Sequence, residues 1–335
     1  MTLYLRYVAK RLLSFAAVVL ASLVINFLVP RLAPGNPIEA VVARLRDLGA
    51  MVGEEELVRE YERMFGLEGD WLTQFLNYLC NVARGNLGYS IPHFPATVSG
   101  MIMRALPWTI GLLSTTVVLS WTIGTVLGAL SGWRGTRSRL GEAFALAALG
   151  LYTIPYYVLA IILVYFLAYL LGLFPISGAY SPGVQPGLNL EFIRDVIWHS
   201  MLPALSIVLA SLGWWYLSMR SMITTIKGED FILMAEAKGL PESMVLWSYA
   251  FRNALLPQVT GLALSIGRIV GGALLTEVVF SYPGIGWLLY AAIMAADYPV
   301  IQGITLLVTL SVCTATFILD LIYPLIDPRV KHGGG

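Results

Sequence analysis

Six long apolar segments constrain this chain more than any other feature of its sequence. They cover approximately residues 9–30, 107–130, 143–171, 201–222, 258–279 and 301–324. A helix needs about 20 mostly apolar residues to cross the hydrocarbon core of a bilayer, and each segment is long enough. The composition agrees, because 58% of the residues are hydrophobic and only 12% are charged, about half the charged fraction of an ordinary soluble domain. We therefore predict an all-α membrane protein with six transmembrane helices.

Lysine and arginine are distributed unequally among the connections between these segments. Twelve basic residues lie in the two tails and in the second and fourth connections: Arg6, Lys10, Arg11, Arg134, Arg137, Arg139, Arg220, Lys227, Lys238, Arg252, Arg329 and Lys331. The two short connections on the opposite side, 172–200 and 280–300, contain only Arg194. Because short cytoplasmic loops carry an excess of basic residues, we predict a multi-pass protein of the cell (plasma) membrane with both termini in the cytoplasm.

The first connection is much longer than a simple turn and lies on the outer side in this topology. It contains "GEEELVREYERMFG" and "DWLTQFLNYLCNVARGNLGYS", each with apolar residues at helical spacing, which predicts two short helices. The connection after residue 171 is rich in Pro, Gly and Ser and is expected to be irregular. The predicted division is 1–30 (cytoplasmic tail and first span), 31–106 (a small extracellular helical domain), 107–325 (the remaining five spans, with a cytoplasmic connection at 223–257) and 326–335 (the cytoplasmic C-terminal tail).

The residue inventory argues against an enzyme. His93, His199 and His332 are isolated, two cysteines make no cluster, and no metal-ligand spacing occurs. No lysine follows a glycine, so the G-x-x-x-x-G-K-[ST] phosphate loop is absent. The net charge of +1 gives no indication of a nucleic-acid partner. We predict no catalytic residues, no metal and no cofactor bound by this chain.

Three ionisable residues lie within the predicted spans, where a charge needs a partner or a watery cavity. Arg268 is near the middle of the fifth span and Glu277 near its outer end, whereas Asp320 is near the inner end of the sixth. For Asp320 we favour pairing within the protein or snorkelling to the interface. Arg268 and Glu277 are candidates for lining a translocation path, although internal pairing is the alternative for both.

The connection 223–257 is charged, yet it lies between two apolar segments. The sequence "EDFILMAEAK" predicts a short helix with Phe231, Met234 and Ala235 on one face. Gly239 can end this helix with a positive φ, and Pro241 fits the first turn of a second helix. Such an element could lie on lipid headgroups as an amphipathic helix or fit a groove on a protein. The Gly-Leu-Pro corner between two short helices favours the protein groove.

Two blocks in this connection resemble the ATPase-contacting loop of importer-type ABC transporter permeases. Residues 235–240 read "AEAKGL" and residues 252–257 read "RNALLP", similar to the signature of the dipeptide/oligopeptide/nickel permease family and its DppB- or OppB-like subunit. The general loop motif has a glutamate six residues before the glycine, where this chain has Leu233, and a shorter Gly-to-Pro spacing. Both departures are usual in the peptide/nickel branch.

The resemblance extends over nearly the whole chain. Further matching blocks are the N-terminal segment with "PGNP" at 34–37, the segment "FGLEGDWLTQFLNYLCNVARGNLGYS", the segment "TEVVFSYPGIGWLLYAAIMAADYPVIQG" and the ending "DLIYPLIDPRV". Four blocks in order, on the predicted topology, identify the chain as a member of this family.

The resemblance implies a type I ABC importer permease fold and a set of partners. These are a second, homologous permease that forms a heterodimer with this chain, two cytoplasmic ABC ATPase subunits that bind ATP and Mg²⁺, an extracellular solute-binding protein, and the lipid bilayer. The resemblance also implies that the loop couples ATP hydrolysis to transport through Phe231, Ala235, Glu236, Ala237, Lys238, Gly239, Leu240, Pro241, Arg252, Asn253 and Pro257.

The substrate and the functional class leave alternatives. Di- and oligopeptides are the leading substrates, members of the same family import oligosaccharides such as cellobiose, and nickel is less favoured because no His or carboxylate cluster lines the spans. From other classes, a self-contained secondary transporter or channel would be expected to show inverted repeats. A membrane-embedded enzyme would need a group of catalytic residues near the spans. Neither signature is visible in the sequence.

Overall fold

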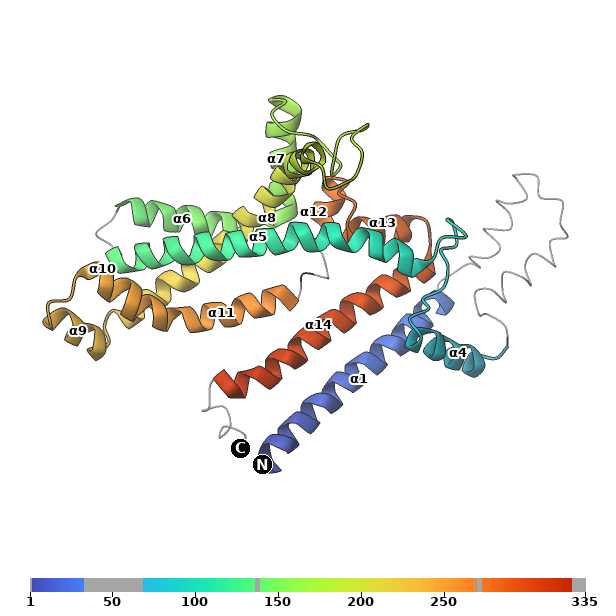
Figure 1. Cartoon of the computed structure of the whole chain (residues 1–335), viewed down its shortest axis with the longest axis horizontal. Helices are drawn as coiled ribbons and strands as arrows, with labels where there is room; N and C mark the ends of the chain where they lie inside the picture. Colours follow the sequence, from blue (N-terminus) through green and yellow to red (C-terminus); the bar gives the residue numbers. More distant parts are fainter. Residues whose placement is uncertain (1, 33–68, 136–138, 268, 270–272, 327–335) are drawn as a thin grey trace. The chain divides into compact units, whose positions relative to one another are not determined.

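The computed structural model describes residues 2–32, 69–135, 139–267, 269 and 273–326. Regular structure in these ranges is helical, with one isolated bridge between Tyr89 and Thr97. The helices are α1 (Thr2–Leu32), α4 (Trp71–Ala83), α5 (Val98–Arg134), α6 (Arg139–Thr153), α7 (Tyr156–Leu163), the π-helix η2 (Val164–Leu170), α8 (Leu190–Ile226), α9 (Asp230–Ala237), α10 (Glu242–Met244), the π-helix η3 (Val245–Phe251), α11 (Arg252–Gly267), α12 (Leu274–Val279), α13 (Ile285–Met294) and α14 (Tyr298–Ile326) (Figure 1).

Among the described residues, four helices are long and apolar enough to cross a membrane. They lie at 6–29, 98–134, 190–226 and 298–318. A fifth candidate is the pair formed by α6 with α7 and η2, which is bent by 99°. The apolar segment 143–171 is therefore broken rather than straight. The cause is Pro155, which has no backbone N–H and disfavours helical geometry in the residue before it.

The remaining predicted segments are described in part. The fifth span, predicted at 258–279, corresponds to α11 and α12, and residues 268 and 270–272 between them lie outside the described residues. In the long first connection, α4 confirms the second predicted helix, whereas the first falls at residues outside the description. Residues 172–189 contain no helix, as expected from their Pro and Gly content.

The chain divides into two compact units. The first comprises residues 1–109, 270–274 and 284–335, and the second comprises residues 110–269 and 275–283. Helix α5 contributes its first turns to the first unit and the rest of its length to the second.

In the first unit, α1 packs along α14. Phe15 and Phe317 meet with ring centroids 5.5 Å apart, and the Thr305 hydroxyl donates to the side-chain oxygen of Asn26 (2.8 Å). At the opposite end, Asp320 Oδ2 lies 3.3 Å from a guanidinium nitrogen of Arg11. This ion pair confirms internal pairing for Asp320, because a carboxylate inside an apolar segment needs a compensating charge.

A buried carboxylate fastens two loops of the first unit to each other. Asp297, between α13 and α14, is 1% exposed. It accepts hydrogen bonds from the Ser90 hydroxyl (2.5 Å) and from the backbone N–H of Ile91 (3.2 Å). The Ser90 hydroxyl also lies 3.3 Å from Nδ1 of His93. Burial raises the pKa of Asp297, although the hydrogen bond from Ser90 opposes the shift.

In the second unit, α5 and α8 approach so closely that only glycine fits between them. A Cβ on Gly124 would lie 2.6 Å from Cβ of Trp215, and one on Gly132 would lie 2.7 Å from the Arg220 carbonyl oxygen. Gly128, midway between them, faces the backbone of Tyr216 in the same way. This four-residue spacing of glycines on one helix face is the pattern that lets membrane helices pack backbone to backbone.

The other side of α8 packs on α6 in a similar manner. Gly213 leaves no room for a side chain against the backbone of Ala148. The neighbouring Tyr216 is buried, and its hydroxyl donates to Ser131 (2.7 Å) and lies 3.1 Å from the Gly141 carbonyl oxygen. Helix α8 is therefore held on two sides by close contacts, to α5 and to α6.

We predict that Gly128→Ala destabilises the protein, because the added methyl group must displace the backbone of α8. Overpacking of this kind costs about 1–3 kcal/mol. Gly111→Ala on the same helix is the matched control, since nothing lies within 4 Å of its Cβ position, and it should gain up to about 1 kcal/mol of helix propensity. Thermal unfolding in detergent measures both variants. Equal stability of the two would contradict the close α5–α8 contact.

A second prediction concerns the pH dependence that Asp297 contributes. Because its pKa is raised on folding, the folded state binds more protons than the unfolded state between the two pKa values. The free energy of unfolding therefore falls as the pH rises through this interval. Relative to Asp297→Asn, the wild type should lose stability as the pH rises from about 4, the ordinary pKa of an Asp side chain, through the raised pKa of Asp297. Unfolding midpoints of both proteins across this range test this, and a pH-independent difference between them would refute it.

Candidate coupling surface

The connection between α8 and α11 forms a bent helical element, as the sequence predicts. Its first helix, α9, ends in a closed C-terminal turn. The N–H of Gly239 donates to the carbonyl of Glu236 (2.9 Å), and the N–H of Leu240 donates to the carbonyl of Ala235 (3.3 Å). This pair of bonds requires a residue in the left-handed conformation just after the helix ends. Gly239 is that residue, with a φ of +73°. The predicted reason for a glycine at this corner is confirmed.

The second half of the connection begins at Pro241, which precedes the first turn of α10. It continues as the π-helix η3 and then as α11. The side-chain nitrogen of Asn253 donates to the carbonyl of Tyr249 (2.7 Å), at the junction between η3 and α11. Short π-helical segments are rare and are often retained at functional sites.

The underside of this element is anchored in a buried core. The core also contains residues of α5 and α8, and its members are Ala129, Trp133, Met219, Ile223, Ile232, Ala235, Val245, Leu246, Ala250 and Ala254. Fully burying one large aliphatic side chain contributes about 1.5–3 kcal/mol. The loop is therefore a packed part of the second unit.

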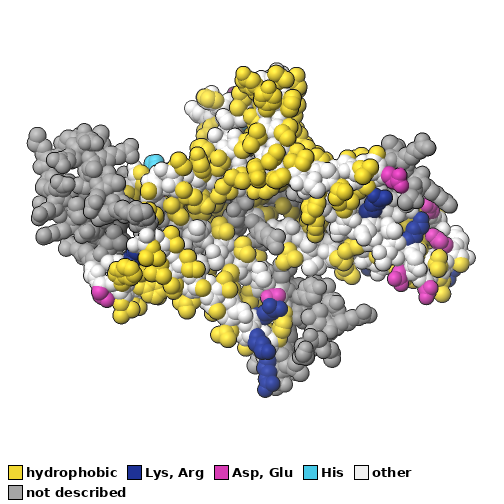
Figure 2. Space-filling model, turned by 180° about the vertical axis from the view of Figure 1, so that it is seen from behind, with side chains coloured by type: hydrophobic (Ala, Val, Ile, Leu, Met, Phe, Trp, Pro, Cys, Tyr) yellow, Lys and Arg dark blue, Asp and Glu magenta, His cyan; other side chains and the backbone are white. Residues whose placement is uncertain are grey.

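The opposite side of the element is exposed and combines apolar with charged residues. The exposed apolar side chains are Phe231, Leu233, Met234, Met244, Trp247 and Tyr249. The exposed charged residues are Lys227, Glu229, Asp230, Glu236, Lys238, Glu242 and Arg252. Figure 2 shows acidic and basic side chains gathered where α9 and α10 lie, while apolar side chains cover most of the long helices. We call the exposed side of residues 229–253 the coupling surface, except for Glu242, whose carboxylate accepts the indole N–H of Trp133.

Most residues that the sequence singles out in this loop lie on that exposed side. Those classed as exposed are Phe231, Glu236, Ala237, Lys238, Gly239, Pro241, Arg252, Asn253 and Pro257, and Leu240 is partly buried. Ala235 is different, because it is buried in the core beneath the loop. The sequence also suggested one face for Phe231, Met234 and Ala235, but Ile232 and Ala235 form the buried face of α9.

The two candidate path residues are placed unequally by the structure. Arg268 lies outside the described residues. Glu277, on α12, is fully buried at 0% exposure, and its backbone carbonyl accepts from the N–H of Tyr282 (2.8 Å). A role of either residue in translocation stays a prediction.

Trp133, which the sequence pattern does not single out, lies against the loop and contacts two of its charged residues. The indole N–H of Trp133 donates to a carboxylate oxygen of Glu242 (2.7 Å), and the Lys227 ammonium donates to the Trp133 carbonyl (2.7 Å). More than ninety residues separate Trp133 from either partner along the chain. No local pattern indicates such a pairing; the available signal is a tryptophan at the end of an apolar segment, beside a basic connection.

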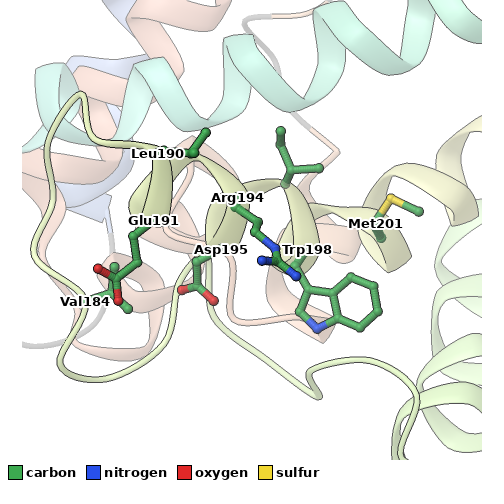
Figure 3. Close-up of a pocket in the computed structure, with 8 residues that line it drawn as sticks. Val184, Leu190, Glu191, Arg194, Asp195, Trp198 and Met201 are labelled. Carbon is green, nitrogen blue, oxygen red and sulfur yellow. The ribbon is translucent and has the colours of Figure 1, made fainter.

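A pocket of about 780 Å³ lies at the start of α8 (Figure 3). Its lining includes Glu191, Arg194, Asp195 and Trp198, and the Arg194 side chain extends toward the Trp198 indole. Asp195 accepts hydrogen bonds from the N–H (2.5 Å) and hydroxyl (2.9 Å) of Ser181. This carboxylate thus holds the preceding connection against α8.

Comparison with known proteins gives one consistent result. Residues 124–332 match the family described as "binding-protein-dependent transport system inner membrane component". A Brucella suis biovar 1 protein named for a peptide permease is 33% identical over 98% of this chain and 99% of its own length. The oligopeptide transport system permease protein AppB of Bacillus subtilis is 31% identical over 97% of this chain and 99% of its own. The di/tripeptide transport system permease protein DppB of Pseudomonas aeruginosa is 29% identical over 98% of this chain and 99% of its own length.

These matches cover α6 to α14 in the family comparison and nearly the whole chain in the pairwise ones. Together with the apolar helices that are long enough to span a bilayer, they establish a multi-pass membrane protein that acts as a transport permease subunit and not as an enzyme. The chain belongs to the family of inner membrane components of binding-protein-dependent transport systems.

Proposed function

We propose that this chain is a permease subunit of an ATP-driven ABC importer for di- and oligopeptides, and that it forms half of the translocation pathway. The observation that carries the proposal is the coupling surface, an exposed apolar and charged face on a loop whose underside is packed into the helical core. A transport permease needs such a surface only if a separate subunit acts on it.

The charges of the coupling surface favour a protein partner over lipid headgroups. Helices that lie on anionic membranes are rich in Lys and Arg on their polar face. This surface instead exposes acidic residues among its basic ones: Glu229, Asp230 and Glu236 beside Lys238 and Arg252. Mixed charge around exposed aromatic and methionine side chains is the composition of a protein–protein contact.

In the proposed topology the chain crosses the membrane six times. α11 and α12 together make the fifth span, and the bent pair of α6 with α7 and η2 makes the third. Both termini and the coupling surface face the cytoplasm, as the distribution of Lys and Arg indicates. Residues 31–106 form the extracellular helical domain, of which α4 is one helix.

The proposed mechanism transmits motion from the cytoplasm to the spans. Phe231, Met234 and Trp247 would enter a groove on one ATPase subunit, and Glu236, Lys238 and Arg252 would make polar contacts around them. Closure of the ATPase pair on ATP would then displace the loop. Because the underside of the loop shares a core with α5 and α8, these helices would move with it as a rigid body, which gives alternating access.

The proposed assembly contains four further subunits. A second, homologous permease would complete the pathway as a heterodimer, two ABC ATPase subunits would bind ATP and Mg²⁺, and an extracellular solute-binding protein would deliver the substrate. This chain itself would bind no cofactor. The apolar faces of helices such as α1, where Leu12, Leu13 and Ile25 are exposed, suit contact with lipid or with the second permease.

Peptides are the substrate class that the relatives favour, since those named above are peptide, oligopeptide and di/tripeptide permeases. Glutathione, a tripeptide, is named for another relative from Pectobacterium atrosepticum. Arg268 and Glu277 are the proposed residues of the translocation path.

Replacing Gly239 tests the proposed function. We expect Gly239→Trp to abolish uptake of a labelled oligopeptide by cells that carry this chain as their copy of the permease, while the protein still inserts into the membrane. The reason is that a side chain at a φ of +73° costs about 1–2 kcal/mol locally and disturbs the closed turn of α9. Uptake of the oligopeptide, with labelled cellobiose in parallel, is the measurement.

Gly135→Trp provides the matched control. Gly135 also has a positive φ (+62°) and open space around its Cβ position, but it lies in the connection between α5 and α6. This variant should retain most of the uptake. Normal uptake by Gly239→Trp would contradict the coupling role, and uptake of cellobiose in place of the oligopeptide would contradict the peptide assignment.

A further inference from the structure

Trp133 lies in the last turn of α5, where this helix contacts the loop that carries the coupling surface. Its side chain is 4% exposed and belongs to the core that α5 and α8 share with the loop. α5 is not adjacent to the loop in the sequence, because the chain continues from α5 to α6 and reaches the loop only after α8. Any force between them therefore passes through side-chain contacts.

Two charged residues of the loop region bind Trp133 from different directions. Glu242, in the first turn of α10, accepts the indole N–H at 2.7 Å. The Lys227 ammonium, at the C-terminal end of α8, donates to the Trp133 carbonyl at 2.7 Å and lies 4.8 Å from the centre of the indole ring. The carbonyls in the last turn of a helix have no partner within that helix, and Lys227 supplies a donor to one of them.

These contacts fix the middle of the loop. The chain from 227 to 252 is tethered covalently to α8 at one end and to α11 at the other. The corner formed by α9 and α10 lies between the two tethers and packs through Ile232 and Val245 on the core that it shares with α5 and α8. The bond from Trp133 to Glu242 adds a direct polar contact between this corner and α5.

We propose that Trp133 is a positioning residue for energy coupling, which acts through Glu242 and Lys227 to make the loop move as one body with α5 and α8. The inference rests on the proposed function, since it assumes that an ATPase subunit moves the coupling surface. A loop that yields would absorb the displacement, whereas a packed element passes it on, because close-packed interiors transmit strain.

Position supports a transmitting role over a direct contact with the partner. The indole is buried, and so it is not part of the coupling surface. The carboxylate of Glu242 is turned toward the indole N–H at hydrogen-bond distance. Loss of this bond leaves the apolar surface of Phe231 and Trp247 in place, and the ATPase can still bind. The expected defect is therefore uncoupling, in which ATP is hydrolysed without proportionate transport.

The test uses the full transporter, purified with its ATPase subunits and reconstituted in vesicles with the solute-binding protein and a labelled oligopeptide. Glu242→Ala removes the acceptor at an exposed position without disturbing the core. We expect the transport rate per ATP hydrolysed to fall about tenfold, the factor that corresponds to one hydrogen bond to a charged acceptor. ATPase co-purification and the rate of ATP hydrolysis should stay within about twofold of wild type.

Three further variants make the test specific to the bond. Glu242→Gln keeps an acceptor oxygen and should retain most of the coupling. Trp133→Phe keeps an aromatic ring but lacks the N–H, and should uncouple as Glu242→Ala does. The double variant should be no worse than either single one, because both remove the same interaction. Glu142→Ala, which removes an exposed carboxylate from α6, outside the coupling surface, is the control and should couple normally.

The outcomes separate this inference from the proposed function. Failure of the unmodified chain to co-purify with an ATPase would overturn both. With the ATPase bound, normal coupling by Glu242→Ala and Trp133→Phe would overturn the inference alone. Loss of ATPase binding by Glu242→Ala would also overturn it, because Glu242 would then contact the ATPase directly.

Discussion

The underside of the loop from α9 to η3 packs into a core that it shares with α5 and α8, and this packing makes the loop part of the second unit. Small residues such as Ala129, Ala235 and Ala250 allow the elements to approach, and Met219, Ile223 and Ile232 fill the space between them. The glycines of α5 extend the close contact along α8. A charged connection that could have been a loose tether is thus an integral part of the helical unit.

This packing explains why the exposed side of the loop can be apolar. Its aromatic and methionine side chains cannot turn inward, because the interior positions are already occupied by Ile232, Val245 and Leu246. In a chain of this family, an apolar surface held rigidly beside a membrane domain has a function when a partner subunit covers it. The closed turn at Gly239 and the π-helix that follows shape the surface without a flexible hinge.

The fold could be predicted well from the sequence where the physical signal is local. Apolar length located the four described helices that are long enough to span a bilayer, the glycine with positive φ located the corner of the loop, and helical spacing located α4. Asp320 was expected to pair internally, and it pairs with Arg11. Two features could not be predicted, because the local sequence pattern does not show them. The bend at Pro155 lies inside a continuous apolar run, and α9 has apolar residues on both sides, so its buried face could not be assigned from the pattern.

Contacts between distant segments were beyond the reach of this reasoning. The bond between Trp133 and Glu242, and the burial of Asp297 against Ser90, each join residues more than a hundred positions apart. The glycine spacing at 124, 128 and 132 is a readable signal of close helix packing, but the sequence does not say that α8 is the partner. Such partners follow only from the folded arrangement.

Photo-crosslinking from the coupling surface tests directly whether an ATPase subunit contacts this loop. A benzophenone amino acid in place of Trp247, which is 39% exposed, should crosslink in intact membranes to a subunit that hydrolyses nucleotides. The same group in place of Tyr169, exposed on η2 within the apolar segment, should not. Crosslinks from position 247 to lipid alone would contradict the claim that this loop is the site at which an ATPase acts on the permease.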